Sequence, residues 1–190
     1  MANKVLTRAQ DGTPPQICFR NSGDFAPATA TDLRVGSPTL VQLNLTSVAN
    51  AGFRQSTKVD LGDPRATRYA IRAALEFAAT PTSQVTCELW WAPSGSATAA
   101  NGNPGNVSGA DGAYTGYSAN ADAAVPQLKR IGTFPTTAQA TGTVQVAECG
   151  EFVPTERYGS LIFVNRSGAA MHNDAVEMHI VFDPIVTEVQ

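Results

Sequence analysis

Along much of this chain, hydrophobic and polar residues alternate with a period of two. The run TLVQLNLTSV (residues 39–48) has aliphatic residues at every second position and polar residues between most of them. QVTCELWW (84–91) and VEMHIVFD (176–183) show the same alternation. Since successive side chains of a β-strand point to opposite faces, each run predicts a strand with one buried face. In the last run, His179 and Val181 are expected on the outward face.

The segment ATRYAIRAALEFAA (66–79) is ambiguous by composition, because its Ala, Leu, Glu and Arg residues favour a helix. Its larger hydrophobic residues, however, recur at alternate positions from Tyr69 to Phe77. A helix would scatter these side chains around its circumference, whereas a strand collects them on one side. We therefore predict a long strand here.

Six further runs have strand character and are separated by turn-forming clusters such as DGTPP, RNSGD and APSGS. They are KVLTR (4–8), QICFR (16–20), STKVDLG (56–62), QLKRIGTF (127–134), GTVQVAEC (142–149) and YGSLIFVN (158–165). Long amphipathic helical stretches are absent from the sequence. About nine or ten short strands predict an all-β fold, a two-sheet antiparallel β-sandwich of jelly-roll-like type. The 190 residues are expected to form a single domain over 1–190 with extended termini.

One long stretch interrupts this pattern. Residues 93–124 contain no convincing strand, and NGNPGNVSGADGAYTGYSANADAA (101–124) has no Lys, Arg, Glu or Leu. Its composition is typical of a flexible linker, yet Tyr114 and Tyr117 are spaced to anchor it. Loops of this length inside a domain are usually functional or disordered. We predict a long loop insertion that is ordered only if the sandwich or a neighbouring subunit holds it.

Composition narrows the classes of function. Charged residues make up 15% of the chain, the formal net charge is −3, and Lys and Arg form no cluster, so nucleic-acid binding is not expected. No apolar run approaches the ~18 residues of a membrane span. The start, MANKVLTRAQDG, lacks the apolar region of a signal peptide, so we expect synthesis in a cytosol. A sparsely charged surface loses little on desolvation, which favours packing against other proteins; a neutral soluble domain is the alternative.

The three cysteines, Cys18, Cys87 and Cys149, are widely spaced and none belongs to a C-x-x-C pair. This spacing argues against a structural zinc site. Each cysteine lies in or beside an apolar run, which predicts buried free thiols in a reducing compartment.

The sequence contains no strong pattern that would indicate a catalytic or metal-binding site. The two histidines, His172 in a turn and His179 on a strand, are expected to be structural, so no catalytic, cofactor-binding or metal residue is predicted. A small jelly-roll enzyme stays open as an alternative; it requires these histidines to meet each other or a carboxylate cluster in a pocket. Asp111 and Asp122 leave open whether calcium binds the loop, although the D-x-D-x-D-G pattern is missing.

Trp90 and Trp91 are adjacent, so one indole should enter the core while the other faces outward. An outward Trp can stack on a sugar ring, or it can be covered by the following loop or by a partner subunit. We favour cover by the following loop or by a partner subunit over sugar stacking.

Two stretches suggest a family. YGSLIFVNRSGAAMHNDAVEMHIVFDPIV (158–186) and ELWWAPSGSATAANGNPGNVSGADGAY (88–114) resemble small β-sandwich virion structural proteins of tailed bacteriophages, of the capsid decoration (cement) or appendage-base type. The resemblance implies a protein that binds the outside of a capsid lattice or a tail component, often as a trimer or other symmetric oligomer. It carries over no functional residue.

We therefore expect a non-enzymatic virion protein, made in the host cytoplasm, that decorates or stabilises a phage capsid. The alternative is a tail or fibre component with a carbohydrate- or receptor-binding sandwich. Capsid or other virion proteins and further copies of the chain are the expected partners, and nucleic acid and membrane are not. The residues expected to contact a partner are Trp90, Asn103, Tyr114 and Tyr117.

Overall fold

The computed structural model describes residues 4–6, 15–63, 65–174 and 176–188, and these residues form twelve strands in two sheets. The strands of the first sheet are β1 (Lys4–Leu6), β2 (Ile17–Arg20), β3 (Thr39–Gln42), β6 (Arg68–Leu75), β10 (Gln145–Phe152) and β12 (His179–Glu188). Those of the second are β4 (Phe53–Gln55), β5 (Val59–Asp60), β7 (Thr86–Ser94), β8 (Gly112–Ala113), β9 (Lys129–Pro135) and β11 (Tyr158–Val164).

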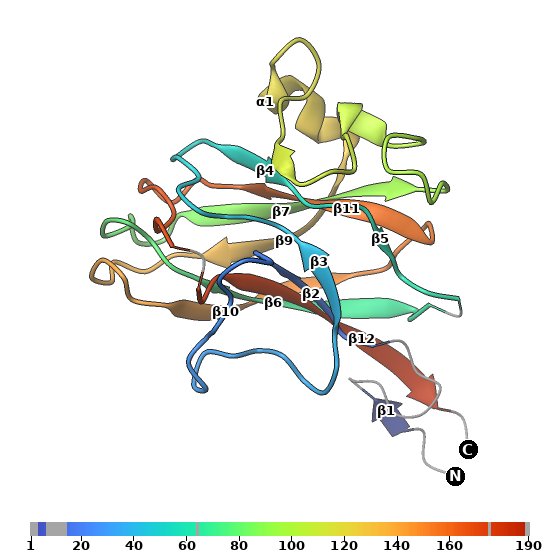
Figure 1. The fold of residues 1–190 in the computed structure, drawn as a ribbon, viewed down its shortest axis with the longest axis horizontal. Coiled ribbons are helices and arrows are strands. Elements are labelled where there is room, and N and C mark those ends of the chain that lie inside the picture. The colour runs from blue at the N-terminus through green and yellow to red at the C-terminus, as the bar shows by residue number, and fades with distance from the viewer. Residues whose placement is uncertain (1–3, 7–14, 64, 175, 189–190) are drawn as a thin grey trace.

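The two sheets lie face to face as the layers of a sandwich (Figure 1). The first has the order β10-β6-β12-β2-β3, with β1 on the far end of β12; the second has the order β8-β4-β11-β7-β9, with β5 on β11. The predicted all-β sandwich is confirmed. One pairing, between β2 and β3, is parallel, whereas the prediction was of antiparallel sheets.

The segment of ambiguous composition is a strand, as its periodicity predicted. β6 pairs antiparallel with β10 on one side and with β12 on the other, so it lies inside the first sheet. Its inward side chains are fully buried from Tyr69 to Leu75. Burial against two neighbouring strands and the opposite sheet thus outweighs the helical preference of its Ala and Arg residues.

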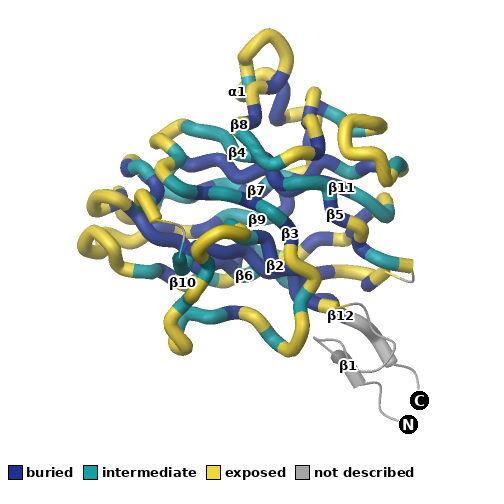
Figure 2. The backbone as a smooth tube through the Cα atoms, in the orientation of Figure 1, coloured by how far each residue is buried: buried dark blue, intermediate teal, exposed yellow. Residues whose placement is uncertain are grey.

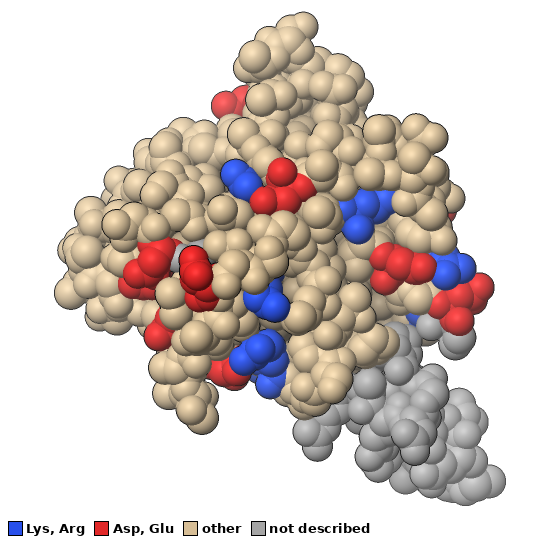
Figure 3. Space-filling view, in the orientation of Figure 1, with Lys and Arg blue, Asp and Glu red and all other residues tan. Residues whose placement is uncertain are grey.

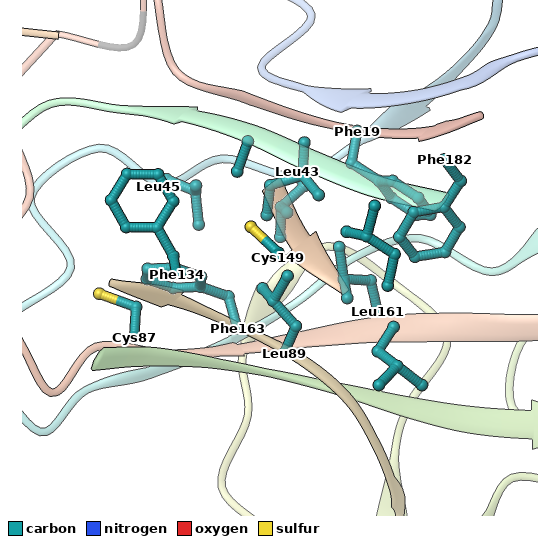
Figure 4. Packing of buried hydrophobic residues seen from close by; sticks show 14 of the residues in the cluster. Phe19, Leu43, Leu45, Cys87, Leu89, Phe134, Cys149, Leu161, Phe163 and Phe182 are labelled. Carbon is teal, nitrogen blue, oxygen red and sulfur yellow. The ribbon is translucent and has the colours of Figure 1, made fainter. Parts of the chain in front are cut away.

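Between the sheets lies one hydrophobic core, which both layers supply (Figure 4). Trp91 is its largest fully buried side chain, and it lies against Phe152 and Phe182 at ring-centroid distances of 5.5 and 5.8 Å. Gly159, on the neighbouring strand β11, makes room for the indole: a Cβ there would lie 2.2 Å from Trp91 Cζ2. The indole therefore requires glycine at this position.

The outer face of the first sheet is also covered, which the alternation did not predict. Because β2 and β3 are parallel, the chain must cross from the end of one to the start of the other, and residues 21–38 do so over the outer face. Leu33 of this crossover packs with Cys18, Ala74 and Val181. The expectation that β12 has one exposed face is therefore wrong: Val181 is fully buried.

A buried polar network holds the crossover. Gln16 Nε2 donates to Leu33 O (3.0 Å) and to Asp183 Oδ1 (2.7 Å), and Arg72 Nε donates to Asp183 Oδ2 (2.7 Å). Val35 N donates to Gln16 Oε1 (2.9 Å). These bonds satisfy polar groups that the crossover would otherwise bury without partners.

Other expectations need smaller corrections. Strand pairing in 39–48 ends at Gln42, and in 56–62 it is confined to β5. β1 pairs with the end of β12, where Lys4 lies opposite Glu188. The remainder of the expected extended termini lies outside the described residues. Among the helices described, none is long and apolar enough to span a membrane.

Candidate functional site

Residues 95–128, between β7 and β9, form a projecting lobe on the second sheet (Figure 1), which we call the crest. It contains β8 and the short helices η1 (Pro104–Asn106), α1 (Ala121–Ala124) and η2 (Val125–Gln127). The sequence predicted an insertion that is ordered only if the sandwich or a neighbouring subunit holds it. The sandwich of the same chain does so.

The crest has a small hydrophobic cluster of its own, where it meets the sheet. Figure 2 shows the buried segments at its base and the exposed ones farther out. The buried members are Ala92, Val107, Tyr114, Ala124, Val125, Leu128, Ile162 and Val164. Since strands and crest both contribute, removing the crest would expose apolar residues of β7 and β11 to water.

Tyr114 is the aromatic anchor of this cluster. Its hydroxyl donates to Gly105 O at 2.6 Å, and its ring lies 6.3 Å from that of Phe53 on β4. Burial raises the pKa of the Tyr114 hydroxyl to about 12, so it stays a hydrogen-bond donor at neutral pH. With 3% of its surface exposed, Tyr114 ties the crest to the sandwich. The residue expected to contact a partner is thus buried within its own chain, and the partner contact stays a prediction.

Lys58, beside β5, holds the first part of the crest. Its three N–H groups are shared among four acceptors: Ser94 Oγ, 2.9 Å from Nζ, and the carbonyl oxygens of Ser96 (3.0 Å), Thr98 (2.8 Å) and Asn101 (2.7 Å). Burial lowers the pKa of the Lys58 ammonium. One cation thereby closes residues 94–101 into a fixed turn.

The crest contains two charged residues, both acidic, and each forms an ion pair with an arginine of the sandwich. Asp111 forms a two-point ion pair with Arg54 of β4, with Nε–Oδ1 at 3.1 Å and Nη2–Oδ2 at 2.6 Å. Asp122 pairs with Arg166, which follows β11. Both carboxylates considered for calcium are thus engaged by guanidinium groups.

The outermost part of the crest is a tight turn over residues 117–120. Asn120 N donates to Tyr117 O at 2.9 Å, and the two central residues, Ser118 and Ala119, have φ values of 51 and 59°. Two successive left-handed residues define a type I′ turn, which is usually made with Asn and Gly. The turn holds Tyr117 at the tip, where 49% of its surface is exposed.

The other two expected contact residues are Asn103, within the crest, and Trp90, on β7. Asn103 Nδ2 donates to the carbonyl oxygens of Ala99 and Val107, both at 2.7 Å, so this side chain holds the crest together. Trp90 faces away from the core, as predicted for one of the tryptophans, and packs against the cluster beneath the crest. Its Nε1 donates to Glu88 Oε2 (3.0 Å), and Arg130 Cζ lies 6.0 Å from the ring centroid.

The exposed surface of the crest is almost free of charge. Of its exposed residues, only Asp122 is charged; the others are Ala, Ser, Thr, Asn, Gly, Pro, Gln and Tyr. In the space-filling view the projecting lobe is almost entirely tan, while red and blue ionic groups lie on the body below it (Figure 3). Little desolvation of charge would accompany contact at this surface.

The two histidines lie in different surroundings. His179 is fully buried, with Nε2 accepting from Leu33 N (3.0 Å) and Nδ1 placed 2.7 Å from Glu177 O. Both ring nitrogens are used, and burial lowers the pKa of the ring, so His179 is a neutral structural residue. The expected structural role is confirmed for this histidine.

His172 lies between two carboxylates, in a contact that the sequence did not predict. Its Nδ1 is 3.4 Å from Glu76 Oε1 and 3.3 Å from Asp174 Oδ2. Burial raises the pKa of the Glu76 carboxyl. This arrangement meets in part the condition set for an enzyme, because one histidine reaches carboxylates and the other does not.

All three cysteines are buried and free, as predicted. Burial raises the pKa of Cys18, Cys87 and Cys149 to about 12, so each thiol is protonated at neutral pH. A protonated thiol is a poor nucleophile and a poor metal ligand.

Arg54 and Lys58 are the residues of this site that sequence reasoning missed. Each lies far along the chain from the crest, with 57 positions between Arg54 and Asp111 and 40 between Lys58 and Thr98. No local pattern marks such pairs. The one usable signal was the absence of Lys and Arg from 101–124, which requires any partner of Asp111 to come from elsewhere.

Comparison with known proteins identifies no relative. No family model matches the chain, and no curated protein is significantly similar to it.

Proposed function

We propose that this chain is a non-enzymatic virion structural protein that decorates or stabilises a bacteriophage capsid, with the crest as the surface that contacts capsid protein. The observation that carries the proposal is a rigidly held lobe with one exposed charge, at Asp122. A lobe fixed by the pairs of Arg54 and Lys58 loses little conformational entropy on binding.

The chemistry of the crest favours an equally uncharged protein surface as the partner. Tyr117, at the tip, supplies a large and rigid contact side chain of the kind enriched at interface hot spots. The surrounding Ala, Ser, Thr and Asn residues can form a flat polar rim. Self-association into a symmetric oligomer such as a trimer is part of the proposal, because lattice positions are related by symmetry.

The alternative of a carbohydrate-binding fibre module relied on Trp90. One side of this residue packs under the crest, and Arg130 lies over its ring. It is not a free stacking platform, so the geometry favours protein contact over sugar contact.

The test compares particle binding by two charge variants. Thr115→Lys with Tyr117→Lys adds two cations at exposed crest positions, and Gln139→Lys adds one at an exposed position of the β9–β10 connection. Particles of the phage that encodes the chain are prepared without it, and each purified protein is added back. We expect the Gln139 variant to reach the wild-type copy number and the crest variant to lose at least about tenfold in affinity.

Mass spectrometry of purified wild-type particles first establishes whether the chain is present in them. If the chain is absent from them, the proposal is wrong. If it is present and the crest variant binds with wild-type occupancy, the protein is a virion component but the crest is not its contact surface.

A further inference from the structure

Glu76, His172 and Asp174 place their side-chain ligand atoms within 4.8 Å of one another. Two of the three separations are 3.4 Å (Nδ1–Oε1 of Glu76) and 3.3 Å (Nδ1–Oδ2 of Asp174). Ligands about 2.1 Å from one zinc ion lie about 3.0 to 3.4 Å apart at octahedral or tetrahedral angles. These separations therefore suit a shared metal ion.

The backbone positions the cluster. His172 N donates to Glu76 O (3.0 Å), and Ala78 N donates to Ala170 O (2.9 Å), so the segment after β6 is paired with the segment that carries the histidine. On the other side, Ser47 N donates to His172 O (2.9 Å). Three parts of the chain thus hold the ligands in place, which is the preorganisation that a metal site requires.

Glu76 gives an independent reason to expect a cation. Its side chain is 9% exposed, and His172 Nδ1, 3.4 Å from Oε1, is the basic group that the structure places beside its carboxylate. A buried carboxylate is strongly disfavoured unless an opposite charge compensates it. Asp174 adds a second carboxylate, with Oδ2 3.3 Å from the same Nδ1, so two acidic groups share one imidazole nitrogen.

We propose that Glu76, His172 and Asp174 bind a divalent transition-metal ion, with Zn²⁺ as the best match. An imidazole nitrogen with carboxylate oxygens suits zinc, whereas calcium and magnesium prefer ligand sets made of oxygen alone. The side chain of Asp174 is 52% exposed, so water has access to complete the coordination. The ion joins the end of β6 to the 170–174 segment as a structural staple, and this inference does not depend on the capsid proposal.

The test measures zinc binding by isothermal titration calorimetry at pH 7, with calcium as the comparison ion. We expect one Zn²⁺ per chain, a melting temperature that rises with zinc concentration, and much weaker binding of Ca²⁺. Asp174→Asn should weaken zinc binding at least about tenfold without unfolding the protein, since the side chain is half exposed. Asp24→Asn, at an exposed position, is the matched control and should bind zinc as wild type does.

Two further measurements make the result decisive. Glu76→Gln and His172→Gln should each reduce zinc affinity, and far-UV circular dichroism reports whether they remain folded. Crystals soaked in zinc should give an anomalous peak among the three side chains. Absence of binding, binding unchanged in Asp174→Asn, or a peak elsewhere would overturn the proposal.

Discussion

Arg54 and Asp111 join the crest to the sandwich by a two-point ion pair whose side chains are 23% and 13% exposed. The same carboxylate accepts from Asn44 N at 3.0 Å, so it ties three segments together. The other acidic residue of the crest, Asp122, is 67% exposed in its pair with Arg166. The two pairs therefore form a matched comparison between a largely buried ion pair and an exposed one.

Replacing Asp111 should loosen the crest. Asp111→Ala leaves the Arg54 guanidinium and the Asn44 amide without their partner, and we expect it to cost about 2 to 4 kcal/mol. Asp122→Ala removes an exposed pair and should cost at most about 1 kcal/mol. Urea denaturation measures both, and hydrogen exchange should show faster exchange within residues 103–128 for the first variant. An equal loss of unfolding free energy in the two variants would show that the Arg54–Asp111 pair stabilises the fold no more than the exposed pair does.

Gly159 should not tolerate a side chain. In Gly159→Ala, the methyl group would meet the fully buried Trp91 ring and lie 2.8 Å from Ala92 O, so we expect a loss of about 3 kcal/mol or more in the free energy of unfolding. Gly112→Ala adds the same methyl group where no atom lies within 4 Å, and its effect should stay within about 0.5 kcal/mol. Thermal and urea unfolding of the pair provide the measurement. A Gly159 variant as stable as the Gly112 variant would contradict the packing described for the core.

His179 should make the protein less stable in mild acid. Burial lowers the pKa of the folded ring, whereas the unfolded ring titrates near pH 6.5. Below about pH 6.5 the unfolded chain binds a proton that the folded chain does not, so the free energy of unfolding falls as pH falls, by up to about 1.4 kcal/mol per pH unit. His179→Gln cannot titrate and should show a shallower slope between pH 7 and pH 5.5 in urea denaturation. Parallel profiles would mean that the ring is protonated in the fold.

The thiols should be unreactive in the folded protein. With pKa values raised to about 12 by burial, Cys18, Cys87 and Cys149 offer almost no thiolate at pH 8. Iodoacetamide should therefore modify none of them under native conditions and all three in guanidinium chloride, as counted by intact-mass spectrometry. Rapid native modification of any one would show that its surroundings open to solvent.

Local periodicity predicted the sandwich because a strand records its two faces in adjacent residues. The alternation from Tyr69 to Phe77 outweighed a helix-favouring composition, and the adjacent tryptophans were correctly assigned to opposite faces. The same reasoning failed for the outer face of β12. Leu33, which covers Val181, belongs to a distant crossover whose path no local pattern reveals.

By itself, then, the sequence determined the all-β class, the inward faces of the main strands, the buried thiols and the position of the long insertion. Tertiary structure alone decided that Arg54 and Lys58 hold this insertion as a crest, that Tyr114 is buried while Tyr117 is exposed, and that His172 meets Glu76. The physical reason is the distance along the sequence over which each feature is encoded. Alternation is encoded between neighbouring residues, whereas an ion pair or a metal-binding cluster depends on where the two sheets bring distant segments together.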